Sequence, residues 1–279
     1  MRRNLANLFG TKLIEAQDAF GQLCVGIDPH SSLLQSWGLA DDVAGLREFA
    51  LTVVEASAGL VSVIKPQVSF FERFGSSGYE VLAEITQMAH SRGLVVIADA
   101  KRGDIGTTMD AYLEAWFGDK SGLYADALTV SPYLGLGATS EGFDKWISKG
   151  KGIYSLVATS NPQGESVQRA KIGDSTLAAD QWLQLSKLNA DNFGPFGAVL
   201  GATLDLSSFG IDQSLLNVPI LAPGFGAQGA LLEDASKLYG SLAKNVAYSV
   251  SRSVLKAGPK ELVSAIQSAN AELKAGLNQ

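Results

Sequence analysis

The segment GLVVIADAKRGDIGTT, residues 93–108, joins an apolar run, a cluster of charges and the start of a helix. Its apolar first half, opened by a glycine, predicts a buried strand. Successive side chains of a strand point to opposite faces, so Asp99 and Lys101 are expected to project to the same side. Asp104 follows, where a helix over about residues 105–117 is predicted to begin. Charges are costly to bury unless they are paired, so a lysine between two carboxylates at a strand end indicates chemistry more than stability.

Two simpler interpretations of these charges stay open at this point. Asp is a good N-cap residue, so Asp104 suits the first position of the following helix. Asp99 and Lys101 equally suit an ordinary solvated ion pair at the end of a strand. The choice depends on which other residues the fold brings to the same place.

The alternation of apolar strand and helix recurs along all 279 residues. Besides the strand of the opening segment, apolar runs predict strands at residues 22–29, 61–66, 125–131, 152–160, 197–203, 218–226 and 245–252. Helices are predicted at 41–59 and 79–92, within 137–150, up to 190 after a polar loop that ends near 174, from the turn at 223–229 to 238, and at about 259–273. Eight such units without a linker or a change of composition are the pattern of a (β/α)₈ TIM barrel.

Polar residues repeatedly follow the predicted strands, at the end where each strand finishes. These residues are Asp28, Lys65, Asp99, Lys101, Ser160, Pro223 and Arg252. In a barrel all of these ends converge on one mouth, which favours the barrel over a doubly wound sheet of similar size. We therefore predict one α/β domain over residues 1–279, with a barrel core at about 22–273 and an N-terminal helical extension at 1–20.

The composition limits the classes of partner. The formal net charge is −6, which argues against nonspecific binding to nucleic acid or to an anionic membrane. No apolar run approaches the length of a membrane span, and no apolar segment of a signal peptide follows the N-terminal charges, so a cytoplasmic location is expected. Cys24 is the only cysteine, which excludes an internal disulfide.

A glycine-rich turn, PGFGAQG at residues 223–229, follows the seventh predicted strand. Glycines let a backbone approach a ligand closely, and amides at a helix start suit a phosphate, although a plain loop has the same composition. Arg252 ends the next strand and strengthens the phosphate interpretation, because its guanidinium matches phosphate oxygens. A phosphate between the last two strand ends is common in barrels of this kind.

Metal binding and Schiff-base chemistry are both disfavoured by the same charges. His30 and His90 are the only histidines and belong to no ligand-spaced cluster, and Lys65 and Lys101 would compete with a metal for the carboxylates. A Schiff base needs a neutral amine, whereas Asp99 and Asp104 should hold the ammonium charged. A charged lysine is a poor nucleophile but a good electrostatic stabiliser and proton donor.

The motif Asp99-x-Lys101-x-x-Asp104 closely resembles the signature of the orotidine 5′-phosphate decarboxylase family. The longer run DAKRGDIG at 99–106, KPQ at 65–67 and TSNP at 159–162 are similar to the longer bacterial subfamily, and the resemblance covers about residues 22–255. It implies conversion of orotidine 5′-phosphate to UMP, the last step of de novo UMP synthesis, without a metal or an organic cofactor. It also implies a homodimer whose subunits share their active sites.

The resemblance assigns roles to individual residues. Lys101 matches the proton donor to C6, and Asp99 the carboxylate beside the departing CO₂. Asp104, with Ile105 and Thr108, matches a group that serves the neighbouring subunit's site. The remaining matches are Asp28 and Lys65 to the ribose hydroxyl network, Ser160 to the pyrimidine, Pro223 and Gln228 to the loop closing over base and phosphate, and Arg252 to the phosphate. Ser251 departs from the glycine that relatives often have there, which puts a backbone contact to phosphate in doubt.

Two rival functions remain open at this stage. A magnesium-dependent sugar-phosphate decarboxylase of the same superfamily shares the Asp-x-Lys-x-x-Asp core, but a second lysine at position 65 disfavours a metal beside Asp99. A phosphate-binding barrel without catalysis would be expected to lack a residue of the Asp-x-Lys-x-x-Asp motif, and all of these residues are present. Decarboxylation without a cofactor leaves a carbanion at C6, so a fixed ammonium that stabilises and then protonates it fits the leading assignment.

Overall fold

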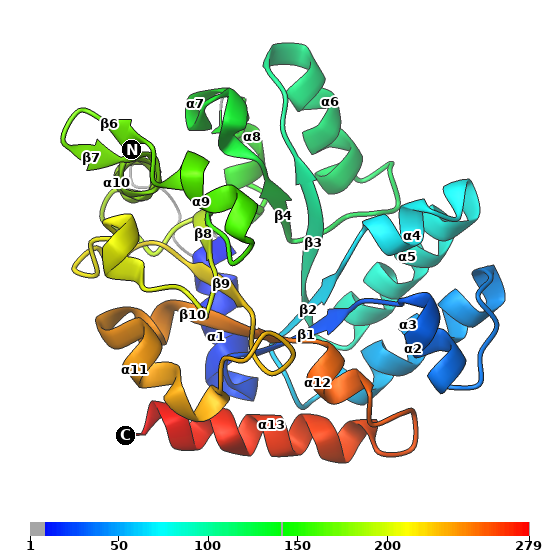
Figure 1. Cartoon of the computed structure of the whole chain (residues 1–279). Coiled ribbons are helices and arrows are strands. Elements are labelled where there is room, and N and C mark those ends of the chain that lie inside the picture. The colour runs from blue at the N-terminus through cyan, green and yellow to red at the C-terminus, as the bar shows by residue number, and fades with distance from the viewer. Residues whose placement is uncertain (1–8, 141, 279) are drawn as a thin grey trace.

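Eight parallel strands close into a barrel, as the sequence predicts. The computed structural model describes residues 9–140 and 142–278. The strands are β1 Leu23–Ile27, β2 Val63–Pro66, β3 Val95–Arg102, β4 Ala127–Val130, β5 Gly152–Ala158, β8 Phe196–Leu200, β9 Ile220–Pro223 and β10 Val246–Val250. Their order around the barrel is β1-β10-β9-β8-β5-β4-β3-β2, and the helices lie outside them (Figure 1). Polar residues that follow the strands therefore meet at one end of the barrel.

The helices connect and surround the strands. They are α1 Phe9–Phe20, α2 Ser31–Ser36, α3 Val43–Ser57, α4 Ser69–Glu72, α5 Gly75–Ser91, α6 Gly106–Phe117, α7 Leu136–Ser140, α8 Asp144–Ile147, α9 Pro162–Gln168, α10 Leu177–Asn189, α11 Ala235–Tyr239, α12 Arg252–Leu255 and α13 Leu262–Leu277. The local sequence sets the start of α3, where the side chain of Asp42 caps the helix by accepting a hydrogen bond from the amide of Gly45 at 2.8 Å. No helix in these described ranges is long and apolar enough to cross a membrane.

Three connecting segments differ from the sequence prediction. The polar loop expected up to residue 174 contains α9, which Pro162 starts, and a hairpin of β6 Lys171–Ile172 and β7 Ser175–Thr176. Gly173, at φ 60°, allows the tight turn of that hairpin. The segment 137–150 holds two short helices instead of one.

The glycine-rich turn is the third difference. No helix begins at this turn, because Gly224, Gly226 and Gly229 all have positive φ, which a right-handed helix cannot continue. A 3₁₀ turn at Leu232–Asp234 and then α11 follow instead. Several amides of the turn, including those of Gly226 and Gly229, already donate to carbonyls of the turn itself, and the turn offers no helix dipole to a ligand.

Helix α1 closes the end of the barrel opposite the mouth. Its Phe9 and Leu13 are fully buried and join an interior cluster to which each of the eight strands contributes a side chain. Phe9 meets Tyr154 edge to face, with ring centroids 5.9 Å apart, and Gly152 leaves room for its ring. The predicted N-terminal extension is thus part of the barrel core from Phe9 onward, and residues 1–8 lie outside the described part.

Candidate active site

Strand β3 carries a bulge at the residues that the sequence singles out. Ala98 pairs with Leu128 and Arg102 with Val130, so three residues of β3 stand opposite one residue of β4. Within the bulge Lys101 has φ 50°, a left-handed conformation that costs a non-glycine residue free energy. Bulges and strained residues concentrate beside functional sites, where they redirect a side chain.

The carboxylate of Asp99 accepts hydrogen bonds at both oxygens. Oδ1 accepts from Lys101 Nζ at 2.6 Å and from Thr129 Oγ1 at 2.9 Å. Oδ2 accepts from Lys65 Nζ at 3.2 Å and from Gln67 Nε2 at 3.0 Å. Burial alone would raise the pKa of Asp99, but Lys65 and Lys101 outweigh burial and hold that pKa well below its ordinary value. Asp99 is therefore a fixed anion with no free oxygen.

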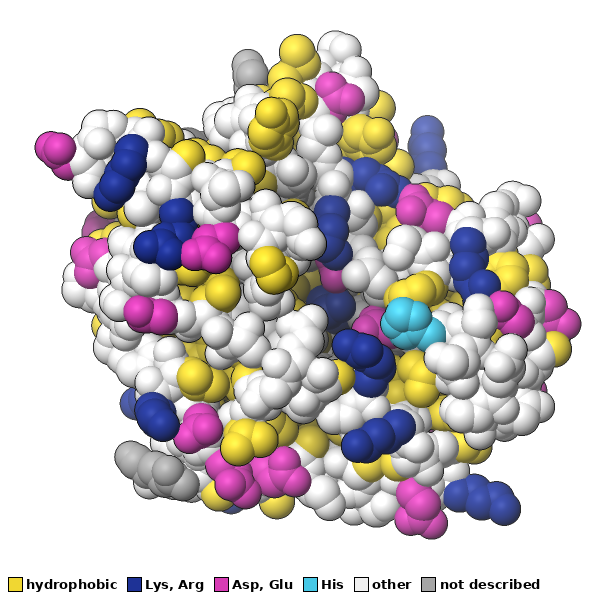
Figure 2. Space-filling view, viewed as in Figure 1, with side chains coloured by type: hydrophobic (Ala, Val, Ile, Leu, Met, Phe, Trp, Pro, Cys, Tyr) yellow, Lys and Arg dark blue, Asp and Glu magenta, His cyan; other side chains and the backbone are white. Residues whose placement is uncertain are grey.

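Lys65 and Lys101 differ in their exposure to solvent. Lys65 is buried, and although burial lowers the pKa of its amine, Asp99 and Asp28 raise that pKa above its ordinary value. The Lys101 side chain is 46% exposed and leads from the buried Asp99 into the mouth. Figure 2 shows basic and acidic side chains around a hollow near the centre of this face.

Two of the buried polar atoms that lack partners among the described residues lie on neighbouring strand ends at the mouth. They are Asp28 Oδ1, just after β1, and Ser251 Oγ, just after the neighbouring strand β10. Gly26 lies between them, because a Cβ there would come within 3.4 Å of both atoms. Buried polar groups normally find a hydrogen-bond partner, so this pair is suited to a polar ligand.

The loops after β5 and β9 meet over the mouth. Ser160 Oγ donates to Gln228 Oε1 at 2.8 Å, which joins the two loops. Behind Ser160, Gln168 of α9 accepts from the amide of Thr159 at 3.0 Å and donates to its hydroxyl at 2.7 Å. The insertion that the sequence predicted as a loop therefore braces this side of the mouth.

The glycine turn and Arg252 lie on adjacent strand ends. Pro223 of β9 pairs with Ser249 of β10, and Arg252 begins α12 three residues later. A Cβ at Gly226 would lie 2.5 Å from the Cβ of Ser253, so the turn packs directly against the start of α12. The turn and the start of α12 are therefore adjacent, without the helix start that was predicted for the turn.

Asp104 forms no ion pair with Lys101 among the described residues of one chain. Its Oδ1 accepts from the amide of Ile105 at 2.9 Å, and Ile105, not Asp104, is the N-cap of α6. Among the described residues Lys101 forms its ion pair with Asp99 alone. Ile105 is 60% exposed and Thr108 is exposed. The expectation of two carboxylates around one lysine is therefore wrong for a single chain.

Comparison with known proteins shows to which family a chain with this site belongs. The family model described as orotidine 5′-phosphate decarboxylase / HUMPS matches residues 21–266. A Streptomyces coelicolor protein named orotidine 5′-phosphate decarboxylase is 51% identical over 255 residues, which are 90% of this chain and 91% of that protein. The chain belongs to this family.

Solved structures agree with the family assignment. A crystal structure from Streptomyces avermitilis, described as an orotidine 5′-phosphate decarboxylase, matches with a TM-score of 0.93 and 47% sequence identity. The match covers 100% of this chain and 99% of that one. The Leishmania donovani OMP decarboxylase has TM-score 0.72 and 27% identity, with 95% of this chain and 99% of that one covered. Both the fold and the family recognised in the sequence are thereby confirmed.

The family signature did not disclose every residue that supports the site. Thr129 and Gln168 received no role from the sequence, although both hold site residues in place. The available signal for Thr129 was a hydroxyl inside an otherwise apolar strand, ALTV at 127–130. Gln67 was part of a recognised motif, but its bond to Asp99 depends on the packing of β2 against β3.

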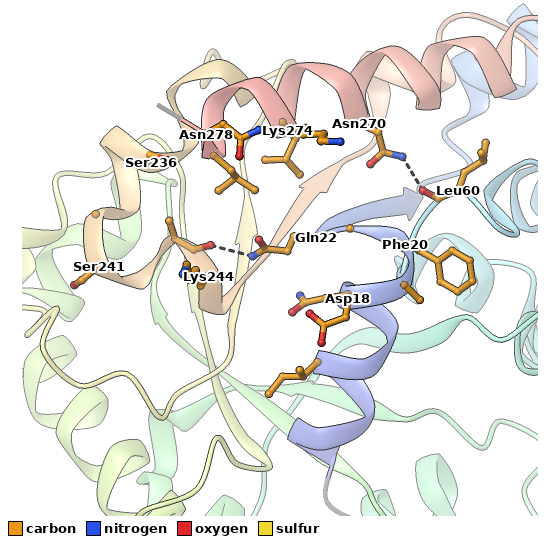
Figure 3. A pocket seen from close by; sticks show the side chains of 18 of the residues that line it. Asp18, Phe20, Gln22, Leu60, Ser236, Ser241, Lys244, Asn270, Lys274 and Asn278 are labelled. Carbon is orange, nitrogen blue, oxygen red and sulfur yellow. Dashed lines mark hydrogen bonds between the residues drawn. The ribbon is translucent and has the colours of Figure 1, made fainter.

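A second hollow, of about 1040 Å³, lies near the closed end of the barrel. Figure 3 shows Asp18 and Phe20 of α1, and Asn270 and Lys274 of α13, around it. Asn270 donates to the carbonyl of Leu60 at 2.7 Å, so part of its polar lining is already engaged. This hollow contains none of the residues of the family signature.

Proposed function

We propose that this chain converts orotidine 5′-phosphate to UMP and CO₂, with Lys101 stabilising and then protonating the C6 carbanion. The observation that carries the proposal is the Asp99 carboxylate, which holds Lys65 and Lys101 together at the barrel mouth. The carbanion has no adjacent electron sink, so a preorganised ammonium is the main stabilisation available. The same ammonium then delivers the proton to C6.

The other site residues are proposed to bind the nucleotide. The unpartnered Asp28 Oδ1 supports a contact to a ribose hydroxyl, together with Lys65. The Ser160–Gln228 bond supports a pyrimidine contact at Ser160 and closure by the loop from Pro223 to Gln228. Arg252 is proposed to bind the phosphate beside the glycine turn. Phosphate binding far from C6 would offset the free energy needed to close and desolvate the site.

We also propose that Asp104, Ile105 and Thr108 serve the site of a second copy in a homodimer. Among the described residues of its own chain, Asp104 bonds only to the backbone amide of Ile105, and the mouth side of the barrel carries exposed apolar side chains after β3 and β4. Besides Ile105, these include Tyr133, 82% exposed, and Leu134, 53% exposed, just after the neighbouring strand β4. Such a patch supports an interface between copies.

The shared site has a direct test by subunit mixing. Lys101→Ala and Asp104→Ala chains are each expected to be inactive, and a mixed dimer should contain some intact sites. Activity should therefore return after subunit exchange. No recovery, when exchange is demonstrated by mass spectrometry, would reject the shared site. We further propose a cytoplasmic location, where pyrimidine nucleotides are made, which cell fractionation would test.

The main experiment measures loss of orotidine 5′-phosphate by absorbance with EDTA present. Turnover is expected to be insensitive to EDTA, because the ammonium groups of Lys65 and Lys101 occupy the carboxylate that a magnesium ion would need. Dependence on added magnesium would favour the sugar-phosphate decarboxylase alternative. Lys101→Ala should keep UMP affinity but lose at least about 10³-fold in kcat, and substantial residual turnover would contradict the role of Lys101.

A further inference from the structure

Thr129 is completely buried and lies opposite the bulge of β3. Its hydroxyl makes two hydrogen bonds in opposite senses. It accepts from the backbone amide of Lys101 at 2.9 Å and donates to Asp99 Oδ1 at 2.9 Å. The donor and acceptor capacity of a threonine hydroxyl suits both bonds at once.

These bonds join the backbone and the side chain of Lys101 into one closed circuit. The Lys101 amide binds Thr129, Thr129 binds Asp99 Oδ1, and that same oxygen binds Lys101 Nζ at 2.6 Å. The left-handed backbone of Lys101, at φ 50°, is unfavourable unless its surroundings hold it. Since the bulge interrupts the regular β3–β4 pairing, the hydroxyl takes the place of a ladder partner for the Lys101 amide.

We propose that Thr129 is a positioning residue that fixes both the Asp99 carboxylate and the bulged backbone of Lys101, so that the ammonium points at C6. The inference rests on the proposed decarboxylation and adds a residue that the family motif does not contain. Thr129 acts through its two neighbours and touches no substrate atom in this role. Its loss should therefore lower kcat and leave nucleotide binding nearly unchanged.

The test compares Thr129→Val, which keeps the shape but removes the hydroxyl, with Thr129→Ser, which keeps the hydroxyl. Thr129→Val should lose about 10- to 100-fold in kcat, because small displacements of a reacting group have effects of this size. Its KM and its UMP affinity should change less than about threefold, and Thr129→Ser should stay within about threefold of the unmodified enzyme.

Thr86→Val is the matched control. Thr86 is also a buried threonine, but its hydroxyl donates to the carbonyl of Leu82 within α5, at 2.8 Å. This variant should retain the kcat of the unmodified protein. If Thr129→Val does not fold, Thr129→Cys replaces it, because a thiol is a similar but much weaker hydrogen-bonding group.

The outcomes separate this inference from the proposed function. If the unmodified chain releases no CO₂ from orotidine 5′-phosphate, the proposed function fails. If it does, and Thr129→Val keeps more than half of its kcat, the positioning role is overturned. The role is equally overturned if Thr129→Ser is as impaired as Thr129→Val, or if the loss appears only in KM.

Discussion

Asp126 secures α1 across the closed end of the barrel and allows a quantitative test of that contact. Its buried carboxylate lies 2.5 Å from Lys12 Nζ of α1 and 3.1 Å from His90 Nε2 of α5. It also accepts from the amide of Val96 at 2.8 Å. Burial alone would raise the pKa of Asp126, but the hydrogen bond from His90 and the charge of Lys12 lower that pKa to about 2.

The lowered pKa fixes the sign and the window of a pH effect. A carboxyl whose pKa is lower in the folded state stabilises the fold above its ordinary value of 3.8. That stabilisation is lost as the pH falls from about 3.8 toward about 2. The difference in pKa corresponds to roughly 2.5 kcal/mol of unfolding free energy at pH 5, of which about half remains at pH 3.

Asp126→Asn is the perturbation that isolates this contribution. We expect it to lower the free energy of unfolding by about 3 kcal/mol at pH 5, because it leaves the ammonium of Lys12 without its carboxylate partner. At pH 3 the difference between the variant and the unmodified protein should be about 1 kcal/mol smaller. Urea unfolding followed by circular dichroism at both pH values measures the two differences.

Lys12→Met is the control variant for the same pH range. It removes one partner of Asp126, and because the Lys12 side chain is 47% exposed, its effect should be smaller than that of Asp126→Asn. A stability difference for Asp126→Asn that is equal at pH 5 and pH 3 would refute the assignment of a lowered pKa to Asp126.

Three further substitutions test other parts of the fold and the site. Asp99→Asn should lower unfolding free energy by about 3 kcal/mol and abolish CO₂ release, because Lys65 stays buried without its carboxylate; urea titration and the absorbance assay measure both. Phe9→Ala should cost about 3–5 kcal/mol of stability by emptying the barrel end, while kcat at low temperature is retained. Gly226→Ala, at φ 73° and against Ser253, should raise KM by about tenfold, and an unchanged KM would separate the turn from phosphate binding.

The sequence predicted those features that depend on local pattern. Apolar runs ending in polar residues located all eight barrel strands, because a strand of a closed parallel barrel is buried along its length. The contact of Asp99 with Lys101 was also expected and is present at 2.6 Å. Strand alternation was an incomplete reason for it, since the β3 bulge and the left-handed Lys101 backbone set that distance as well.

Features that depend on contacts between distant segments escaped prediction. Thr129 reads as one more residue of an apolar strand until β4 is placed beside β3. Gln168 lies in a segment whose polarity suggested a loop, and only its bonds to Thr159 reveal α9 as a support of the mouth. For Asp104 the sequence indicated a charged partner, and the described part of a single chain supplies only the amide of Ile105.

Asp99 of β3 and Asp126, just before β4, are both buried carboxylates, but they differ in what holds them. This difference predicts that Asp126 contributes to stability alone, whereas Asp99 contributes to both stability and chemistry. Asp126 is held partly by the amide of Val96, a backbone donor that cannot be redirected by a ligand. The hydrogen bonds to Asp99 that hold its carboxylate all come from side chains, two of them lysines, and one of these lysines leads into the mouth. A ligand can exchange such partners without breaking a strand. Asp126→Asn should therefore change unfolding free energy and leave kcat unaltered, whereas no substitution of Asp99 should alter one without the other.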